Sequence, residues 1–501
     1  MHLPCCPRSR RRAETRLVPV LLALACACSD AARSTAPNVP PTPPVTVPVP
    51  EKPPIEAENA APGSREWFSE RLAPQGDLSV WASPYAPHAG DTLDVYVHAM
   101  RGPVRVQLYR LGYYGGAGGR MEWERGGVPA APQPACTPAV PGPVECPWQV
   151  TVRVPLGAGW TSGIYLVKVT DAAGMAAAYP LVVEDDRRTR FTVVVPQLTW
   201  QAYNSFGGAS LYTYPGGGYG HHVSFERPYG RTGGAMFAYT RGVSNEVEAV
   251  HWLEKEGWDV TYVSDARLSG AARPEIDPSK GVIFAGHDEY WTMAGFDRVQ
   301  RLRDAGKHLA FLSGNNLYWN VRLSPGRVTG RADQVISCFK YDPDPDAASP
   351  EVATRRFRSL GKPENAVYGI MFDRVAEADG RPLYVADSTA GPEARQFLAA
   401  AGLQPGDSIP DTLAGEGDEI MGNGRTPANL QVLFKSPFLP RGGTGPAGFY
   451  YTTFFIAPSG AGVFASGSNE YARALDDWFG SPADARLQRL THAVLQWMQD
   501  H

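Results

Sequence analysis

Two short apolar runs, each followed by a cluster of polar and aromatic residues, constrain the possible fold of this chain most. They are Gly281–Trp291 and His308–Trp319. Apolar runs of this length are typical of strands that are buried on both faces of a sheet. In a sheet of alternating strands and helices, ligands commonly bind at the carboxyl ends of the strands. The sequence therefore predicts a pocket where these two strands end.

Two further apolar runs extend the same predicted sheet. They are Phe191–Val195 and Asp259–Val263, and segments with helical spacing separate the strands. Ser244 can cap a helix that Gly257 ends, and a second helix has an apolar face of Phe296, Val299 and Leu302. This alternation predicts a mostly parallel sheet with helices on both faces. Right-handed crossovers would bring the strand ends to one edge.

The alternation of strands and helices becomes hard to recognise after Lys340. Apolar runs return later, at Gln431–Lys435, Gly448–Ile456 and Gly462–Ser466. A terminal helix with one apolar face is expected over Ala485–Gln499. We interpret these segments as extensions of the same sheet and a closing helix. The larger α/β domain is therefore predicted to span residues 190–501.

The segment before this domain has a different pattern. From Leu78 to Asp185, short runs alternate between apolar and polar residues, with turn residues between them. About seven strands of this kind predict an immunoglobulin-like β-sandwich, which we place at residues 70–186. One connection, Gly112–Gly119, is rich in glycine and tyrosine. It is either a long turn or a loop that leans over the pocket of the neighbouring domain.

The first 28 residues have the pattern of an export signal. Basic residues within Arg8–Arg16 precede an apolar stretch, Leu17–Ala25, that is too short to span a bilayer. The segment Leu24–Ser29 resembles a bacterial lipobox, in which Cys28 would be acylated, and Cys26 is the competing site. Plain secretion is the alternative.

A Pro-rich segment follows the predicted signal. Residues 29–65 should form an extended tether, so that a lipid would hold the protein at the bacterial cell envelope without a membrane-spanning helix. Export also favours a disulfide between Cys136 and Cys146, whereas Cys338 is expected to be buried. The net charge is −4 and the basic residues are scattered, which argues against a nucleic-acid partner.

Side chains rich in oxygen follow the predicted strands. Tyr203 and Tyr212 come after the first strand, His287 and Glu289 after the third, and Asn315 after the fourth. Phenol and carboxylate oxygens suit a ferric ion, which would act as a Lewis acid toward a carbonyl or a water molecule. The alternative is that these tyrosines only pack and form hydrogen bonds. The chain has no Gly-x-Ser-x-Gly elbow, His-Glu-x-x-His motif or Walker loop.

Several short motifs carry a resemblance to a known family. They are Tyr113–Gly116, Trp200–Asn204, Gly207–Tyr212, Val223–Tyr229, Gly286–Trp291, Ser313–Trp319 and Pro458–Gly467. Together they resemble the large (β) subunit of N,N-dimethylformamidase and its relatives. The similarity runs from about Arg105 to the C-terminus.

The resemblance implies an amidotransferase-like α/β domain and a mononuclear Fe(III) site. The iron ligands that it implies are Tyr203, Tyr212 and Glu289. His287 would position or activate water, Asn315 would hold the carbonyl oxygen, and Lys340 would give electrostatic support. The implied activity is that of an iron-dependent amidohydrolase, in which metal-activated water attacks the carbonyl carbon of a linear amide and the C–N bond breaks.

Export separates this chain from the enzyme that it resembles, whose large subunit assembles with a small partner. The substrate could then be an environmental amide or a cell-surface carbohydrate, and a homo-oligomer is a further expectation. The competing hypothesis is a metal-free surface lipoprotein that binds a carbohydrate or a protein through an aromatic crevice. Its stacking platforms would be Trp200, Trp291 and Trp319.

Overall fold

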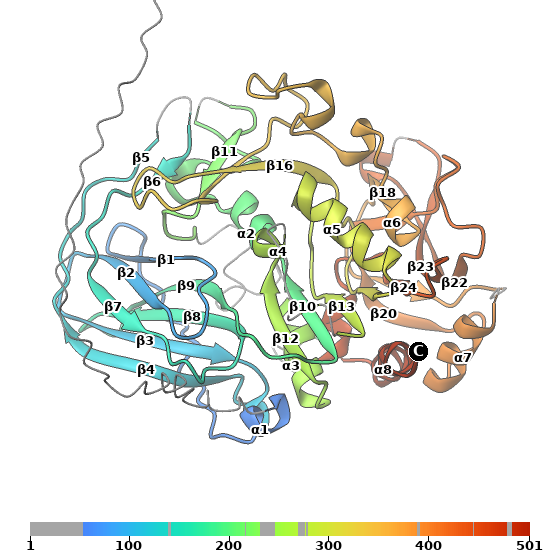
Figure 1. Ribbon diagram of the computed structural model, residues 1–501, viewed down its shortest axis with the longest axis horizontal. Helices are drawn as coiled ribbons and strands as arrows, with labels where there is room; N and C mark the ends of the chain where they lie inside the picture. Colours follow the sequence, from blue (N-terminus) through green and yellow to red (C-terminus); the bar gives the residue numbers. More distant parts are fainter. Residues whose placement is uncertain are drawn as a thin grey trace, which may run out of the picture. The chain divides into compact units, whose positions relative to one another are not determined.

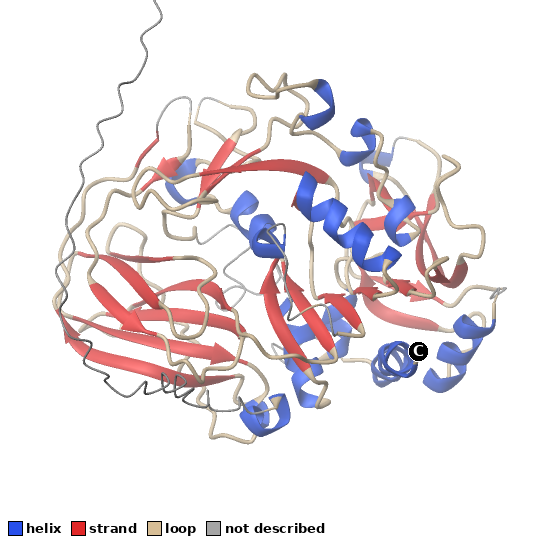
Figure 2. Ribbon diagram, in the orientation of Figure 1, coloured by secondary structure: helices blue, strands red, loops and turns tan. Residues whose placement is uncertain are grey.

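The computed structural model describes residues 54–138, 142–215, 217–230, 246–268, 276, 279–387, 391–443, 445–477 and 483–501. The predicted export signal with Cys26 and Cys28, most of the predicted tether and the predicted cap Ser244 lie outside the described residues. Within those ranges the chain is a mixed α/β protein, built mostly from strands, with sheets of mixed orientation (Figure 1 and Figure 2). No helix in the described ranges combines the length and the apolar character needed to cross a membrane.

Two antiparallel sheets form the part of the chain between residues 78 and 183. One has the strand order β1-β2-β7 and the other the order β4-β3-β8-β9. The bounds are β1 Leu78–Ser83, β2 Thr92–Ala99, β3 Val104–Leu111, β4 Gly119–Val128, β7 Val152–Pro155, β8 Gly163–Thr170 and β9 Ala176–Val183. β7 alternates buried Val152 and Val154 with exposed residues, as a strand with one face toward a core does. Buried side chains from both sheets belong to one hydrophobic cluster.

A sheet with the strand order β12-β10-β13-β15-β24-β23-β22 follows. The bounds are β10 Phe191–Val195, β12 Val260–Ser264, β13 Gly281–Phe284, β15 His308–Phe311, β22 Gln431–Phe438, β23 Gly448–Ile456 and β24 Gly462–Ala465. Strands β12 to β24 of this order pair in parallel, whereas β23 and β22 are antiparallel to their neighbours. Every residue of β10 is buried, which explains its continuous apolar run, because neither of its faces meets solvent. The segment around Gly462 thus lies inside the sheet and not at its edge.

The main helices follow their apolar spacing. They are α3 Glu246–Lys255, α5 Met293–Asp304, α7 Pro392–Ala401 and α8 Ala485–Asp500. The side chain of Thr292 accepts a hydrogen bond from the backbone N–H of Gly295, which satisfies a free donor at the start of α5. α8 ends one residue beyond the prediction and buries Leu487, Leu490, Val494 and Met498.

A third sheet lies at the carboxyl ends of the strands of the larger one, with the order β11-β17-β16-β14. The bounds are β11 His222–Ser224, β14 Tyr290–Thr292, β16 Trp319–Ser324 and β17 Val335–Ser337. β14 and β16 pair in parallel with Tyr290 opposite Trp319, so the segments that follow β13 and β15 run side by side. Two short helices, α2 Gln197–Tyr203 and α4 Asp265–Leu268, follow β10 and β12.

The stretch after Lys340 contains elements that the sequence pattern did not predict. They are α6 Asn365–Tyr368, β18 Met371–Val375, β19 Arg381–Tyr384, α7, β20 Ser408–Leu413 and β21 Glu416–Glu419. β18 pairs with β21, and β19 with β20, each with a shift in register. These strands lack the continuous apolar runs of β13 and β15, and four to six residues show too few alternations for a strand period to be recognised.

The folded part begins earlier than predicted. Residues 54–65, which we assigned to the tether, contain α1 Ile55–Asn59, in which Ile55 and Glu58 are buried. The hydroxyl of Tyr114 donates to Glu58 Oε1 over 2.7 Å. Trp67 is buried as well. The tether prediction is therefore wrong from Pro54 onward.

The connection Gly112–Gly119 packs against α1 and α3. The ring of Tyr113 lies 5.1 Å from the ring of His251 on α3, between centroids. Asn59 of α1 accepts hydrogen bonds from the backbone N–H groups of Tyr113 and Tyr114, at 2.8 and 2.9 Å. These contacts favour the long turn over a loop that leans on the pocket.

A buried ion pair lies beneath this connection. Arg110 Nη2 on β3 is 2.7 Å from Glu254 Oε1 on α3, and neither side chain is exposed. Tyr262 donates a hydrogen bond to the same carboxylate oxygen over 2.7 Å, and the backbone oxygen of Ser162 accepts from Arg110. The pair thus joins the antiparallel part of the chain to the α/β part.

Replacing Arg110 with methionine should destabilise the protein strongly, because the carboxylate of Glu254 would stay buried without its cation. We expect the free energy of unfolding to fall by about 3–5 kcal/mol, measured by urea denaturation. Arg153→Met is the matched control, since Arg153 is 70% exposed in its ion pair with Asp94 and should cost less than about 1 kcal/mol. Equal losses in the two variants would contradict the importance of the buried pair.

Candidate functional site

Tyr203 and Tyr212 come from one turn that follows β10. Tyr203 is the last residue of α2. The first turn of this helix is fixed by a hydrogen bond from the backbone N–H of Leu198 to the side chain of Asp265. The chain then reverses at Gly207, which has a φ of +75°, a left-handed conformation that favours glycine. The two tyrosine rings end up stacked, with their centroids 4.4 Å apart.

Glu289 lies between β13 and β14 and meets both tyrosines. Its Oε2 is 2.9 Å from the Tyr203 hydroxyl and 2.8 Å from the Tyr212 hydroxyl, and the two hydroxyls are 2.8 Å apart. Trp319 Nε1 donates to Oε1 over 2.8 Å. The hydroxyl of Thr199 accepts from the backbone N–H of Glu289 over 3.0 Å, which anchors this residue to α2. The structure therefore brings the predicted ligand set together.

His287 and Lys340 surround this carboxylate. His287 Nε2 lies 3.4 Å from Glu289 Oε2, and Nδ1 lies 3.3 Å from the backbone oxygen of Gly314. Lys340 Nζ lies 3.5 Å from the centroid of the Tyr212 ring, close enough for a cation–π contact. Lys340 has a φ of +57°, which is uncommon for a residue with a side chain.

The charges of the site shift its acids and bases. Burial would raise the pKa of Glu289, but the hydrogen bond and charge of His287 and the charge of Lys340 outweigh burial and lower it. For His287, burial acts to lower the pKa, and the neighbouring carboxylates of Glu289 and Glu416 raise it to about 9. Burial and the charge of Glu289 raise the pKa of Tyr203 and Tyr212 well above the ordinary range. Without a cation, both phenols therefore keep their protons and donate hydrogen bonds.

Glu416 is a neighbour that our sequence analysis missed. It lies on β21, with Oε2 3.5 Å from His287 Nε2 and 3.2 Å from Asn315 Nδ2. Asn315 has a φ of +51°, and its backbone N–H donates to Asp418 over 2.9 Å. Glu416 and Asp418 are two residues apart, which is the only signal in the sequence that two acids share one face of a strand.

The tryptophans predicted as stacking platforms are in the core. Trp200, Trp291 and Trp319 are 2%, 0% and 4% exposed, so their ring faces are not available to a ligand at the surface. Exposed aromatic surface lies beside Trp319, whose ring is 5.4 Å from that of Tyr341 between centroids. Tyr219 is 46% exposed and Tyr341 is 63% exposed, and their ring centroids are 6.3 Å apart.

Other residues that the sequence analysis considered have partners other than Glu289. Ser313 donates to Asn469 Oδ1 over 2.9 Å, and Cys338 is buried, which raises the pKa of its thiol to about 12. His221 and His222 bind separate partners, Asp342 and Ser337. Cys136 and Cys146 form a disulfide. Among the described residues, no group of three His, Cys, Asp or Glu side chains is arranged to hold a metal.

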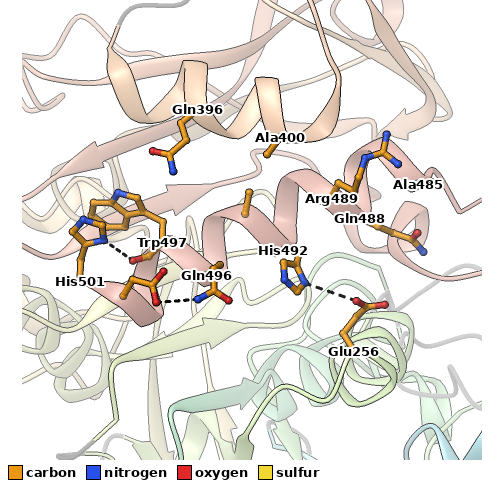
Figure 3. Close-up of a pocket in the computed structure, with 12 residues that line it drawn as sticks. Glu256, Gln396, Ala400, Ala485, Gln488, Arg489, His492, Gln496, Trp497 and His501 are labelled. Carbon is orange, nitrogen blue, oxygen red and sulfur yellow. Dashed lines mark hydrogen bonds and ion pairs between the residues drawn. The ribbon is translucent and has the colours of Figure 1, made fainter.

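A separate cavity of about 500 Å³ lies between α7 and α8 and next to the end of α3 (Figure 3). Figure 3 shows Gln396, His492 and Trp497 around it, with His492 Nδ1 3.8 Å from Glu256 Oε2. None of the residues that line this cavity belongs to the set around Glu289. We place the candidate site at the strand ends, where the polar groups converge, and not in this cavity.

Comparisons with known proteins agree with the motifs around Glu289. The family described as "N,N-dimethylformamidase beta subunit-like, C-terminal" matches residues 105–485. The chain belongs to this family. At the level of class, membership in the N,N-dimethylformamidase beta subunit-like family indicates a hydrolase of that type.

Other comparisons add little to the family assignment. None of the curated proteins matches the chain. Among solved structures, a chain titled "mmIFT52 N-terminal domain" is 13% identical, covering 49% of this chain and 87% of its own length. Its TM-score of 0.28 is too low to indicate a shared fold.

Replacing Tyr212 with phenylalanine should destabilise the metal-free protein, because a buried carboxylate would lose a hydrogen-bond donor. We expect a loss of about 2 kcal/mol in urea denaturation, the range for hydrogen bonds to charged groups. Tyr471→Phe is the control, since the buried hydroxyl of Tyr471 lies 2.8 Å from a neutral partner, the Thr491 hydroxyl, and should cost about 1 kcal/mol. A smaller loss for Tyr212→Phe than for the control would contradict a charged Glu289.

Proposed function

We propose that this protein is an exported, iron-dependent amide hydrolase that acts on linear C–N bonds. The observation that supports the proposal most is the convergence of two phenols and one carboxylate at the ends of the strands. Tyr203 and Tyr212 each place a hydroxyl within 2.9 Å of Glu289 Oε2. The family assignment supports the same chemistry at the level of class.

The residues fit a mononuclear Fe(III) ion by the chemistry and spacing of their oxygens. The three oxygens lie 2.8–2.9 Å apart, close enough for one cation to contact all of them. Phenolate and carboxylate are hard donors, which suit a ferric ion. Tyr203, Tyr212 and Glu289 would hold it. When bound, the ion supplies a Lewis acid that ionises phenols and activates water.

The neighbouring side chains have distinct roles in this proposal. His287, which its neighbouring carboxylates keep protonated at neutral pH, donates a hydrogen bond that holds a water molecule in place. The Nδ2 group of Asn315 has a second N–H, which can donate to the carbonyl oxygen of the amide as negative charge develops there. Lys340 adds positive charge nearby and holds the Tyr212 ring in place. Water oxygen then bonds to the carbonyl carbon, the C–N bond breaks, and one of the two water protons leaves with the amine.

We also propose a more specific architecture for the two parts of the chain. We assign the two antiparallel sheets to an immunoglobulin-like sandwich, because strands of this number and spacing with a shared core suit that architecture. We assign the following part to an amidotransferase-like domain with a mostly parallel sheet. The run of parallel pairs from β12 to β24 supports this assignment.

The iron proposal is tested by colour and metal content, because charge transfer from a phenolate to Fe(III) absorbs visible light. Purified protein supplied with iron should absorb in the visible range and hold about one iron per chain. Glu289→Gln should lose most of the iron without unfolding. The control, Glu364→Gln, also alters a buried carboxylate next to an arginine, Arg358, and should keep the iron. Colourless, metal-free wild-type protein after iron is supplied would overturn the proposal.

A second candidate function is a metal-free binding surface for carbohydrate. The exposed rings of Tyr219 and Tyr341 favour it, since paired aromatic faces can stack on a sugar ring. Lys340 Nζ lies 5.0 Å from the Tyr219 ring and 3.5 Å from the Tyr212 ring, so this surface adjoins the candidate site. Wild-type protein that stays metal-free yet binds soluble oligosaccharides would favour this candidate.

The proposed location is the bacterial cell envelope, with a lipid on Cys28. Cys28→Ala with Cys26 intact should move the protein from the membrane fraction to the soluble fraction, because the acylated residue would be lost. Cys26→Ala is the matched control and should leave the fractionation unchanged. Unchanged fractionation of Cys28→Ala would refute this lipidation site, and release by Cys26→Ala alone would transfer it to Cys26.

A further inference from the structure

A buried arginine that is not part of the turn between Tyr203 and Tyr212 forms hydrogen bonds to the backbone of this turn. Arg227 is 0% exposed, and its Nη1 donates to the backbone oxygens of Phe206 and Ala209, both over 2.9 Å. Its Nη2 donates to the backbone oxygen of Asn204 over 2.9 Å. Hydrogen bonds from a charged donor are stronger than neutral ones. The shape of the turn therefore depends on where Arg227 lies.

A disulfide-closed hairpin from the antiparallel part packs on the same turn. It pairs β5 Thr137–Pro138 with β6 Val144–Glu145, and Cys136 and Cys146 close it. Val144 is 0% exposed, and its side chain lies directly against Gly207. A Cβ atom added to Gly207 would come within 2.8 Å of Val144 Cγ1, so no space is left between this glycine and the Val144 side chain.

The hairpin is also bonded to the segment that carries Arg227. The backbone N–H of Cys146 donates to the backbone oxygen of Glu226 over 2.9 Å. The hydroxyl of Ser224 donates to Glu145 Oε1 over 3.2 Å, and Arg327 pairs with the same carboxylate. Ser224 and Glu226 are 0% exposed. One hairpin thus contacts the turn directly through Val144 and indirectly through the strand next to Arg227.

We propose that the hairpin closed by Cys136–Cys146 positions the turn that carries Tyr203 and Tyr212, with Val144 as the positioning residue. The disulfide limits how far β6 can separate from Cys136, so it keeps Val144 pressed on Gly207. Loss of that contact gives the turn new conformations and separates the two hydroxyls. The role of these hydroxyls in catalysis rests on the proposed function, whereas the positioning itself rests on the contacts alone.

Hydrogen exchange of the metal-free protein tests the proposal before and after reduction. Dithiothreitol breaks the S–S bond, two cysteine thiols form, and the reductant is oxidised to its cyclic disulfide. The amides to follow are Gly208, Ser210 and Leu211, which donate to backbone oxygens within or beside the turn. We expect their exchange to become at least tenfold faster on reduction, while β10 and β13 stay protected. Unchanged exchange in the turn would overturn the proposal.

A pair of variants separates positioning from general loss of stability. Val144→Ala removes the contact with Gly207, whereas Val154→Ala removes the same atoms from β7, where Val154 is 1% exposed and pairs with Leu93. Only Val144→Ala should speed exchange in the turn and weaken Fe(III) binding, measured as the visible band during iron titration. Equal effects of both variants would contradict the positioning role. If wild-type protein binds no iron, the proposed function fails while the exchange result still decides this inference.

Discussion

A carboxylate that is almost out of contact with water must find other partners, and this constraint organises the site. Glu289 is 3% exposed, and transfer of an unpaired carboxylate into such surroundings is costly. The hydroxyls of Tyr203 and Tyr212 and the indole of Trp319 donate to it, and His287 adds positive charge. The carboxylate therefore determines which side chains gather around it.

The sheet brings these partners together although they are far apart in the sequence. β10, β13 and β15 are neighbours that pair in parallel, so their carboxyl ends share one edge. The segments that leave β13 and β15 then pair with each other as β14 and β16, which places Trp319 opposite Tyr290 and next to Glu289. The direction of the strands thus explains why residues 30 to 86 positions away from Glu289 contact its carboxylate.

The part of the site that follows continuous apolar strands could be predicted from the sequence, and the part on short mixed elements could not. Apolar runs that end in polar residues identified Tyr203, His287 and Glu289, because parallel strand ends must meet. Glu416 lies on a strand too short to show a period, so the sequence offered no reason to place it beside His287. Residues 54–65 were assigned to the tether for a similar reason, since one helical turn gives little periodicity.

Contacts remote from Glu289 explain why its neighbours hold their positions. The turn between the tyrosines includes two glycines with positive φ, and such a turn has little intrinsic stiffness. Arg227 fixes its carbonyl oxygens, and Val144 closes the space over Gly207. Val144 belongs to the antiparallel part. Among the residues that the structure describes, this part contributes none of the groups that bind the carboxylate of Glu289. The antiparallel part thus contributes to the arrangement of the site through packing, because a small shift of the turn would change the distance between two hydroxyls that are now 2.8 Å apart.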